Sequence, residues 1–378
     1  MQKLVLFVVI FSLVFCLFGI NASANENLNI SAKSAIVICM DTGEILYEKS
    51  ATQKLPMAST TKIMTALILA EQPDLAKTIK VTRQMVTVEG SSMGLMPDDT
   101  VSYRDLLYGM LLASGNDAAN TTAYALGGSI KGFAQMMNKK AKELGLKNTS
   151  FVTPSGLDDE NHYTTAYDLA LLASVALKNT AFRAACSSKQ AVLYYGNPPY
   201  RRSLTNHNKL LGNYEGLIGV KTGFTKKSGR CLVTAAERDG KRVIAVTLNA
   251  PDDWNDHRAL LDYGLSATDV VSFSNNDITD VLPVICSDAD LVRIKAEEKS
   301  FCTASNSAKN IKRNIILSKF IYTPVSAGEL VGRVEYSLNS KVIATSNIYS
   351  VANLPIRNKK EKFLNRLFKS LSLIWNNS

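Results

Sequence analysis

The chain has 378 residues, which suits two domains better than one, and 46% of its residues are hydrophobic, which is enough for a sizeable core. Its formal net charge of +10 is modest for this length, and an appreciable part of it lies in the C-terminal tail. That distribution favours an anionic membrane surface or wall polymer as a partner and argues against nucleic acid.

The amino terminus has the pattern of an export signal. A short charged start precedes an almost unbroken apolar run over residues 4–20, and Ala22-Ser23-Ala24 forms a small-residue cleavage site. The alternative is a retained membrane helix, but the run is short for a span. We therefore predict a signal peptide over residues 1–24 and an exported mature protein.

The first β pattern is a hairpin, with apolar runs at 35–40 and 44–47 around a D-x-G turn. A second hairpin spans 230–249. Between them, helical patterns cover 103–114, 118–126, 130–144 and 165–177, and Asp168 occupies the capping-box position of the last. Strands at both ends with helices between them predict an α+β domain, in which the two hairpins share one antiparallel sheet flanked by helices.

A possible nucleophile follows the first hairpin, where Ser59 and Lys62 form the only S-x-x-K of the chain. Three residues apart on a helix, the two side chains share a face, so the amine can take the hydroxyl proton. Ser59 as a mere helix cap and Lys62 as a solvated side chain are the alternative. However, the residues after Lys62 are almost all apolar, which predicts a buried helix and a lowered lysine pKa.

Two further triplets follow in chain order. Ser114 and Asn116 flank a glycine between two helical patterns, although Ser274-Asn275-Asn276 matches the same S-x-N pattern. Lys221-Thr222-Gly223 ends an apolar strand, where a cation, a hydroxyl and a bare backbone can bind an extended peptide and its terminal carboxylate. We prefer it to the rival K-S-G at Lys227, which begins the turn into the next strand.

Cysteines and histidines give no sign of a metal site. The five cysteines after the signal peptide have no C-x-x-C or metal-like spacing, and the three histidines form no H-E-x-x-H. Cys39 and Cys231 lie in apolar runs and are interpreted as core residues, whereas a disulfide between Cys286 and Cys302 is possible but unforced.

The last part of the chain changes character. A helical pattern at 257–265 is followed by short β-type runs at 281–285, 291–294, 315–322, 330–338 and 341–349. We interpret residues 269–355 as a small all-β domain. Residues 356–378 place Leu, Phe, Ile and Trp on one helical face and lysines mostly off it, as in helices that lie in a membrane interface. Docking of this helix on the protein's own surface is the alternative.

The order S-x-x-K, S-x-N, K-T-G is a specific set, found in penicillin-binding proteins and serine β-lactamases. The sequence resembles the low-molecular-mass penicillin-binding proteins, specifically the D-alanyl-D-alanine carboxypeptidases, serine peptidases of the S11 type. Nearly the whole chain shares this resemblance, including the signal peptide, the β-rich domain and the amphipathic anchor. The segments that carry the resemblance are residues 58–65, 113–118, 156–158, 164–168 and 221–225.

The resemblance implies a penicillin-binding/β-lactamase-like transpeptidase domain over residues 25–268 and a cofactor-free acyl-enzyme reaction on peptidoglycan stem peptides. In that reaction Ser59 is the nucleophile, Lys62 the base, Ser114 the proton relay and Asn116 the orienting group. The remaining implied roles belong to the substrate-binding strand, namely Lys221, Thr222, Gly223 and the backbone N–H of Phe224. β-Lactam antibiotics are expected to acylate Ser59. Some members of the family have His where Phe224 stands.

Two competing interpretations differ in chemistry. Class A β-lactamases use a glutamate in an E-x-x-x-N context, and Glu143, Glu160 and Glu215 all lack it, so rapid penicillin turnover is not expected. A non-catalytic wall-binding protein would keep the groove without the reactive side chains, and those side chains are present. The implied site of action is the outer face of the cytoplasmic membrane and the cell wall.

Overall fold

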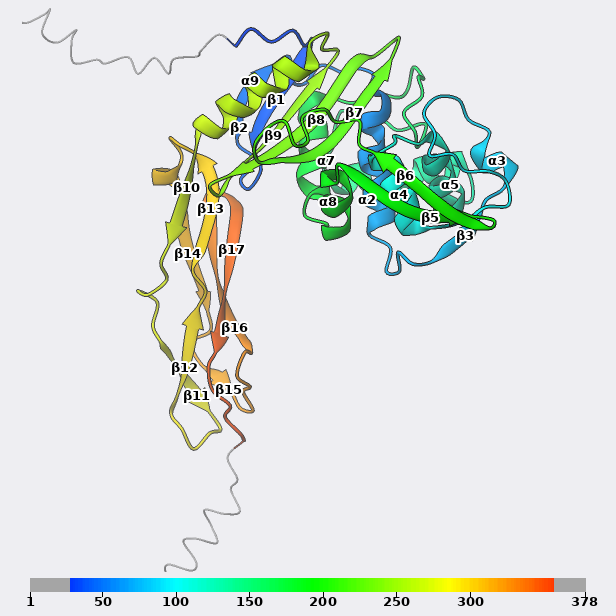
Figure 1. The fold of residues 1–378 in the computed structure, drawn as a ribbon. Coiled ribbons are helices and arrows are strands. Elements are labelled where there is room, and N and C mark those ends of the chain that lie inside the picture. The colour runs from blue at the N-terminus through cyan, green and yellow to red at the C-terminus, as the bar shows by residue number, and fades with distance from the viewer. Residues whose placement is uncertain (1–27, 357–378) are drawn as a thin grey trace, which may run out of the picture. The chain divides into compact units, whose positions relative to one another are not determined.

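The structure is a computed structural model that describes residues 28–356 (Figure 1). The predicted signal peptide and the predicted tail helix therefore lie outside the described residues. Within residues 28–356, no single helix combines the length and apolarity of a membrane span, although the bent pair Ala166–Ala176 and Thr180–Ser187 does so when taken together.

A five-stranded sheet with the order β2-β1-β9-β8-β7 forms the centre of the first domain. All its neighbouring strands are antiparallel, and Ser34 of β1 pairs with Leu248 of β9, so the two predicted hairpins do share one sheet. The strands are β1 (Ser34–Cys39), β2 (Ile45–Lys49), β7 (Leu217–Thr225), β8 (Gly229–Arg238) and β9 (Lys241–Leu248). The predicted α+β arrangement is confirmed.

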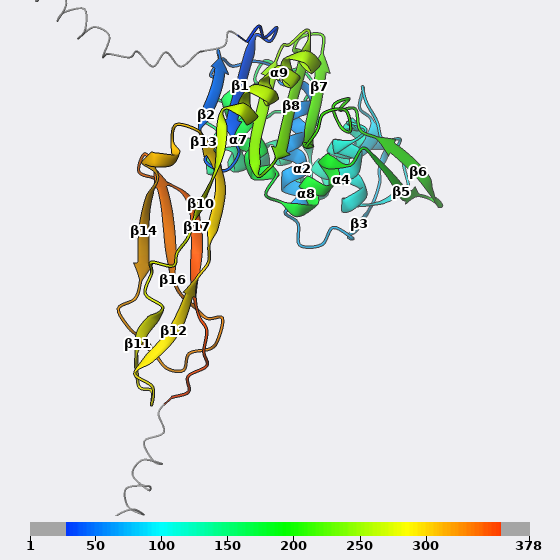
Figure 2. The same ribbon diagram turned by 60° about the vertical axis from the view of Figure 1, so that its left-hand side comes forward.

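Helices cover both faces of this sheet (Figure 2). Helix α9 packs on one face, where Gly264 closely approaches Val37 and Val243, whereas α7, α8 and α2 pack on the other. The helices are η1 (Ala58–Thr61), α2 (Lys62–Ala70), α3 (Arg83–Val86), α4 (Tyr103–Leu111), α5 (Asn116–Gly127), α6 (Ile130–Glu143), α7 (Ala166–Ala176), α8 (Thr180–Ser187) and α9 (Asp253–Ser266).

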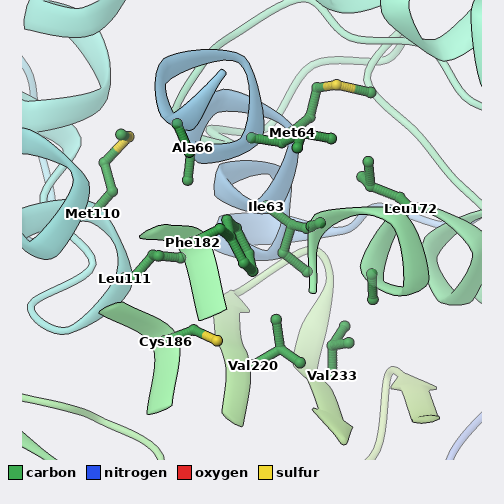
Figure 3. Close-up of a cluster of buried hydrophobic side chains, with 14 of the residues drawn as sticks. Ile63, Met64, Ala66, Met110, Leu111, Leu172, Phe182, Cys186, Val220 and Val233 are labelled. Carbon is green, nitrogen blue, oxygen red and sulfur yellow. The ribbon is translucent and has the colours of Figure 1, made fainter. Parts of the chain in front are cut away.

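Helix α2 runs through the core, as its apolar sequence predicts, and every residue from Lys62 to Ala70 is buried. Figure 3 shows Ile63, Met64 and Ala66 of α2 among buried side chains from both neighbouring helices and the sheet. The labelled neighbours are Met110, Leu111, Leu172, Phe182, Cys186, Val220 and Val233. A helix packed on all sides has little freedom to shift, so it holds the residues at its first turn in place.

Several elements depart from the prediction. Helix α8 and a four-stranded sheet of order β3-β4-β5-β6 were not predicted from sequence patterns. The strands of this sheet are β3 (Thr78–Lys80), β4 (Thr100–Ser102), β5 (Gln190–Gly196) and β6 (Pro199–Thr205). Thr165 caps α7 because its hydroxyl oxygen accepts from the Asp168 N–H. The second bond of a capping box, from the Thr165 N–H to the Asp168 carboxylate, is not formed. The Asp168 carboxylate instead accepts from Asn148 N and Thr149 Oγ1, and so anchors the preceding loop.

The C-terminal part is built of β-strands, as predicted, apart from the single 3₁₀ turn η2 (Ala308–Asn310). It contains a pair, β10 (Thr268–Phe273) with β13 (Lys299–Ala304), and a six-stranded sheet of order β14-β16-β17-β12-β11-β15. The strands of the second sheet are β11 (Val281–Ile285), β12 (Leu291–Ala296), β14 (Lys312–Leu317), β15 (Ile321–Tyr322), β16 (Leu330–Leu338) and β17 (Lys341–Ser350). The run predicted at 315–322 is therefore two strands in different places of the sheet.

This part has its own core around the buried Tyr336, Phe301 and Ile348. Cys286 is exposed and Cys302 is buried, and the five cysteines of the described residues all carry free thiols. Cys39 and Cys231 are buried, which agrees with their interpretation as core residues.

Candidate active site

The S-x-x-K segment forms a tight turn that leads into α2. Residues Ala58–Thr61 make the 3₁₀ helix η1, and Ala58 has a positive φ of 46°, which is unusual for a residue with a side chain. The Thr60 and Thr61 hydroxyls donate to the carbonyls of Met57 (2.6 Å) and Ala58 (2.7 Å). Side-chain hydrogen bonds therefore hold the strained backbone that carries Ser59.

Lys62 is fully buried directly behind Ser59. Its Nζ lies 2.9 Å from Ser59 Oγ, 2.6 Å from Asn116 Oδ1 and 2.7 Å from the Ser155 carbonyl oxygen. Burial, and after it the nearby charge of Lys221, hold the pKa of Lys62 well below its usual value, against the opposing effect of Asp117. A neutral amine has two protons, which suit the two carbonyl oxygens, and its lone pair is then free to accept the Ser59 hydroxyl proton.

The S-x-N segment lies on the connection between α4 and α5, as expected. Asn116 is the first residue of α5, and its Nδ2 donates to the Glu89 carbonyl (2.6 Å) while its Oδ1 faces Lys62. Ser114 is 4% exposed, has a positive φ of 58° and lines the same cleft as Ser59. The rival S-x-N is elsewhere, because Asn275 is buried in the C-terminal core next to Tyr336.

Lys221, Thr222 and Gly223 lie within β7, at the edge of the central sheet. A Cβ on Gly223 would lie 3.1 Å from the Ser59 nitrogen, so any side chain here would crowd the nucleophile turn. Burial lowers the pKa of Lys221 to about 7, and its Nζ donates to the Thr222 carbonyl at 2.8 Å. Phe224 is 66% exposed, and the rival Lys227 is exposed in the turn after β7.

These segments meet at a cleft of about 410 Å³. The residues predicted from sequence that line it are Ser59, Ser114, Thr222, Gly223 and Phe224, with Lys62, Asn116 and Lys221 buried behind them. Its other lining residues are Ser91, His207, Lys209, Arg230, Asp253 and Trp254. Three segments distant in the sequence therefore converge on one site, as the motif order required.

Sequence reasoning missed the far side of the cleft. Arg230, which pairs across strands with Phe224, donates to Asp253 at 2.8 Å and lies 5.8 Å over the Trp254 ring. Burial and the Lys221 charge lower the pKa of His207. None of these residues belongs to a recognised triplet, so the only available signal was an arginine seven positions beyond Gly223 in a strand pattern.

Two supporting groups were also missed. Asp117, buried at the start of α5, accepts backbone N–H groups from Met93, Gly94 and Leu95 and fixes the segment that follows Ser91. The Ser155 carbonyl, which faces Lys62, is a backbone group and leaves no mark in the sequence. Among residues 28–356 no three His, Cys, Asp or Glu side chains are placed to hold a metal ion.

Comparisons of the chain with protein families, related proteins and solved structures agree with one another. Residues 21–252 match the family described as D-alanyl-D-alanine carboxypeptidase, and residues 270–355 match the C-terminal domain of penicillin-binding protein 5. The chain is 33% identical over 352 residues to the D-alanyl-D-alanine carboxypeptidase DacF of Bacillus subtilis, an alignment that covers 90% of this chain and 89% of that protein. It is also 33% identical over 349 residues to DacC of Escherichia coli, with 87% and 86% covered.

Solved structures with the same fold include penicillin-binding protein 5 of Haemophilus influenzae. That structure has 25% sequence identity and a TM-score of 0.62, and the match covers 86% of this chain and 98% of the other. The DD-transpeptidase of Streptomyces K15 has 34% identity and a TM-score of 0.60, with 63% of this chain and 98% of the other covered.

Proposed function

Because the chain belongs to the D-alanyl-D-alanine carboxypeptidase family, and is thus a serine peptidase, we propose that Ser59 removes the terminal D-alanine of peptidoglycan stem peptides through an acyl-enzyme. The resemblance inferred from the three motifs is confirmed, and so are the predicted enzyme class and the fold of a penicillin-binding domain followed by a β domain. The residue roles below are our assignment.

In the first step Ser59 Oγ attacks the carbonyl carbon between the last two D-alanines, while Lys62 Nζ takes the hydroxyl proton. The backbone N–H groups of Ser59 and Phe224 hold the resulting oxyanion, an arrangement typically worth about 10²–10³-fold in rate per donor. Gly223 lies so close to the Ser59 turn that an added Cβ would be 3.1 Å from the Ser59 nitrogen. This proximity of β7 to the turn supports the assignment of the Ser59 and Phe224 N–H groups to one oxyanion.

Collapse of the tetrahedral intermediate breaks the C–N bond and expels D-alanine. Ser114, at the cleft wall, passes a proton from Lys62 to the leaving amine, and Asn116 keeps the Lys62 amine directed at Ser59. Thr222 and Lys221 bind the terminal carboxylate, and Gly223 permits close approach. Water then hydrolyses the ester, which returns Ser59 to its free form without any cofactor.

We also propose a role for each part of the chain. Residues 1–24 direct export, residues 25–268 catalyse, residues 269–355 form the β-rich domain, and residues 356–378 bind an anionic membrane surface from outside the cell. Cell-wall peptides are the substrates, and β-lactams acylate the same serine. Relatives include a protein named D-alanyl-D-alanine endopeptidase in Escherichia coli, so cleavage of cross-links is a second candidate activity.

The burial of Lys62 within 2.9 Å of Ser59 Oγ is the observation that carries this proposal. The test measures D-alanine release from a defined pentapeptide muropeptide, with a cross-linked dimer as competing substrate, and labelling by a fluorescent penicillin. We expect D-alanine release and one penicillin adduct per chain, both abolished in Ser59→Ala. Labelling that survives this substitution contradicts the assignment, and rapid nitrocefin turnover would indicate a β-lactamase instead.

A further inference from the structure

A buried histidine that the reaction does not use lies directly behind the nucleophile turn. His162 is 3% exposed and precedes α7. Its Nε2 lies 2.7 Å from Thr61 Oγ1, and its Nδ1 accepts from the N–H of Val152 at 3.0 Å, with the N–H of Thr153 at 3.4 Å. One imidazole therefore joins two segments that are about a hundred positions apart.

These contacts fix the tautomer of the ring. Two backbone N–H groups point at Nδ1, so Nδ1 must be the unprotonated acceptor and the proton must lie on Nε2. The Nε2–H then donates to Thr61 Oγ1, whose own hydroxyl donates to the Ala58 carbonyl at 2.7 Å. Because burial lowers the pKa of His162 to about 4, against Asp159 and Asp158, the neutral ring persists at neutral pH.

The first segment is the turn that carries Ser59. Thr61 ends η1, and the Ala58 carbonyl that it holds belongs to the residue with φ of 46°. A Thr61 hydroxyl without its imidazole donor could rotate and bond elsewhere. The imidazole therefore commits the Thr61 hydroxyl to the strained carbonyl next to the nucleophile.

The second segment contains the Ser155 carbonyl, which accepts a hydrogen bond from Lys62. Residues 152–156 run from the Val152 and Thr153 N–H groups on His162 to Ser155, whose oxygen lies 2.7 Å from Lys62 Nζ. The segment also packs tightly on the nucleophile turn, since a Cβ on Gly156 would lie 1.9 Å from the Ala58 oxygen. Any shift of this segment would move an acceptor of the catalytic amine.

We propose that His162 is a positioning residue, whose neutral imidazole sets the spacing between the Ser59 turn and the Ser155 carbonyl and thereby aims Lys62 at Ser59. This inference rests on the proposed roles of Ser59 and Lys62. His162 touches neither reacting atom, so its loss should slow acylation while leaving the binding of substrate in the cleft unchanged.

The experiment measures acylation by penicillin under stopped flow, which separates the dissociation constant of the first complex from the acylation rate constant. His162→Phe keeps the edge contact with the Phe151 ring, at 5.9 Å between ring centroids, and removes both nitrogens. We expect the acylation rate constant to fall about 10–100-fold, as for an angstrom-scale misplacement, with a less than twofold change in the dissociation constant.

Thr61 variants test the same link without a new aromatic ring. Thr61→Val removes the hydroxyl in nearly the same volume and should slow acylation similarly, whereas Thr61→Ser keeps the hydroxyl and should retain most of the rate. If the two side chains act as one unit, the double variant His162→Phe/Thr61→Val should be no slower than the slower single variant.

His257 provides the matched control for stability. It too is buried with both ring nitrogens hydrogen-bonded, here to the hydroxyls of Thr234 at 2.6 Å and Thr247 at 2.9 Å, but it lies on α9 on the other face of the sheet. His257→Phe should lower the melting temperature by an amount comparable to His162→Phe and leave the acylation rate constant within about twofold, as expected for a residue outside the site.

The pH profile adds a readout that a loss of stability would not move. The Ser155 carbonyl favours the charged form of Lys62, so its displacement in His162→Phe should move the acid limb of acylation to lower pH, with Lys221 and Asp117 unchanged. A Ser59 adduct formed at the wild-type rate in both His162→Phe and Thr61→Val overturns the positioning role alone. A wild-type adduct on a residue other than Ser59 overturns the proposed function together with it.

Discussion

Replacement of Asn116 by Asp tests the role of Lys62 most directly. The substitution keeps the size of the side chain but places a carboxylate where Asn116 Oδ1 now lies, 2.6 Å from Lys62 Nζ. An opposite charge favours the charged form of a lysine, so the pKa of Lys62 must rise. Because the proposed base is the neutral amine, acylation of Asn116→Asp should require a higher pH than acylation of the wild type.

The expected size of the shift follows from the distance. Two unit charges 2.6 Å apart attract by about 6 kcal/mol at an effective dielectric constant of about 20. Desolvation of the new carboxylate removes a large part of this gain. Measured shifts beside an opposite charge are about 1–3 pH units, so the rate at a pH below the acid limb should fall about 10–1,000-fold.

The assay is the pH dependence of penicillin acylation, followed under single-turnover conditions. Asn116→Ala is the matched control, since it also loses the bond from Nδ2 to the Glu89 carbonyl but adds no charge. We expect the acid limb of Asn116→Asp to lie 1–3 pH units above that of Asn116→Ala. Coincident acid limbs in the two variants would mean that Lys62 is not the group whose deprotonation allows attack.

Two further outcomes concern the cleft wall and the tail. Arg230→Ala removes a half-buried guanidinium that lines the cleft together with Thr222, and should raise KM for a D-alanyl-D-alanine peptide about tenfold, as for one lost charge-assisted contact, with kcat changed less. An unchanged KM, measured by D-alanine release, would leave the carboxylate to Lys221 and Thr222. Deletion of residues 357–378 should release the mature protein from vesicles containing anionic lipid in a flotation assay, and its continued flotation would locate the membrane contact elsewhere.

Local patterns predicted the parts of the site that depend on local structure. The S-x-x-K spacing places Ser59 and Lys62 together because one helical turn joins them, and the apolar residues after Lys62 require that turn to be buried. The order of the three motifs identified Ser114 and Lys221 through resemblance to a family, since neither triplet is specific by itself. Such positions could be predicted without knowledge of the tertiary contacts.

Other features depend on tertiary contacts that no short segment encodes. Ser155 contributes only a backbone carbonyl, and His162 acts through Thr61, about a hundred positions away. Helix α8 is short, and it is stabilised because it buries Phe182 and Cys186 against the sheet. Its own sequence pattern is too short to predict a helix. Asp168 occupies a capping-box position, yet its carboxylate accepts from the Asn148 N–H of a nearby loop instead.

The pairing of β1 with β9 has a consequence for how the catalytic part assembles. Ser34 of β1 pairs with Leu248 of β9, so β1 can find this neighbour only after almost the entire domain has been synthesised. Closing so long a loop is slow, because its entropy is lost before the contact forms. Until β9 has been made, the central sheet cannot close at β1. For a chain that is proposed to be exported, this delay keeps the catalytic part from folding before it has crossed the membrane.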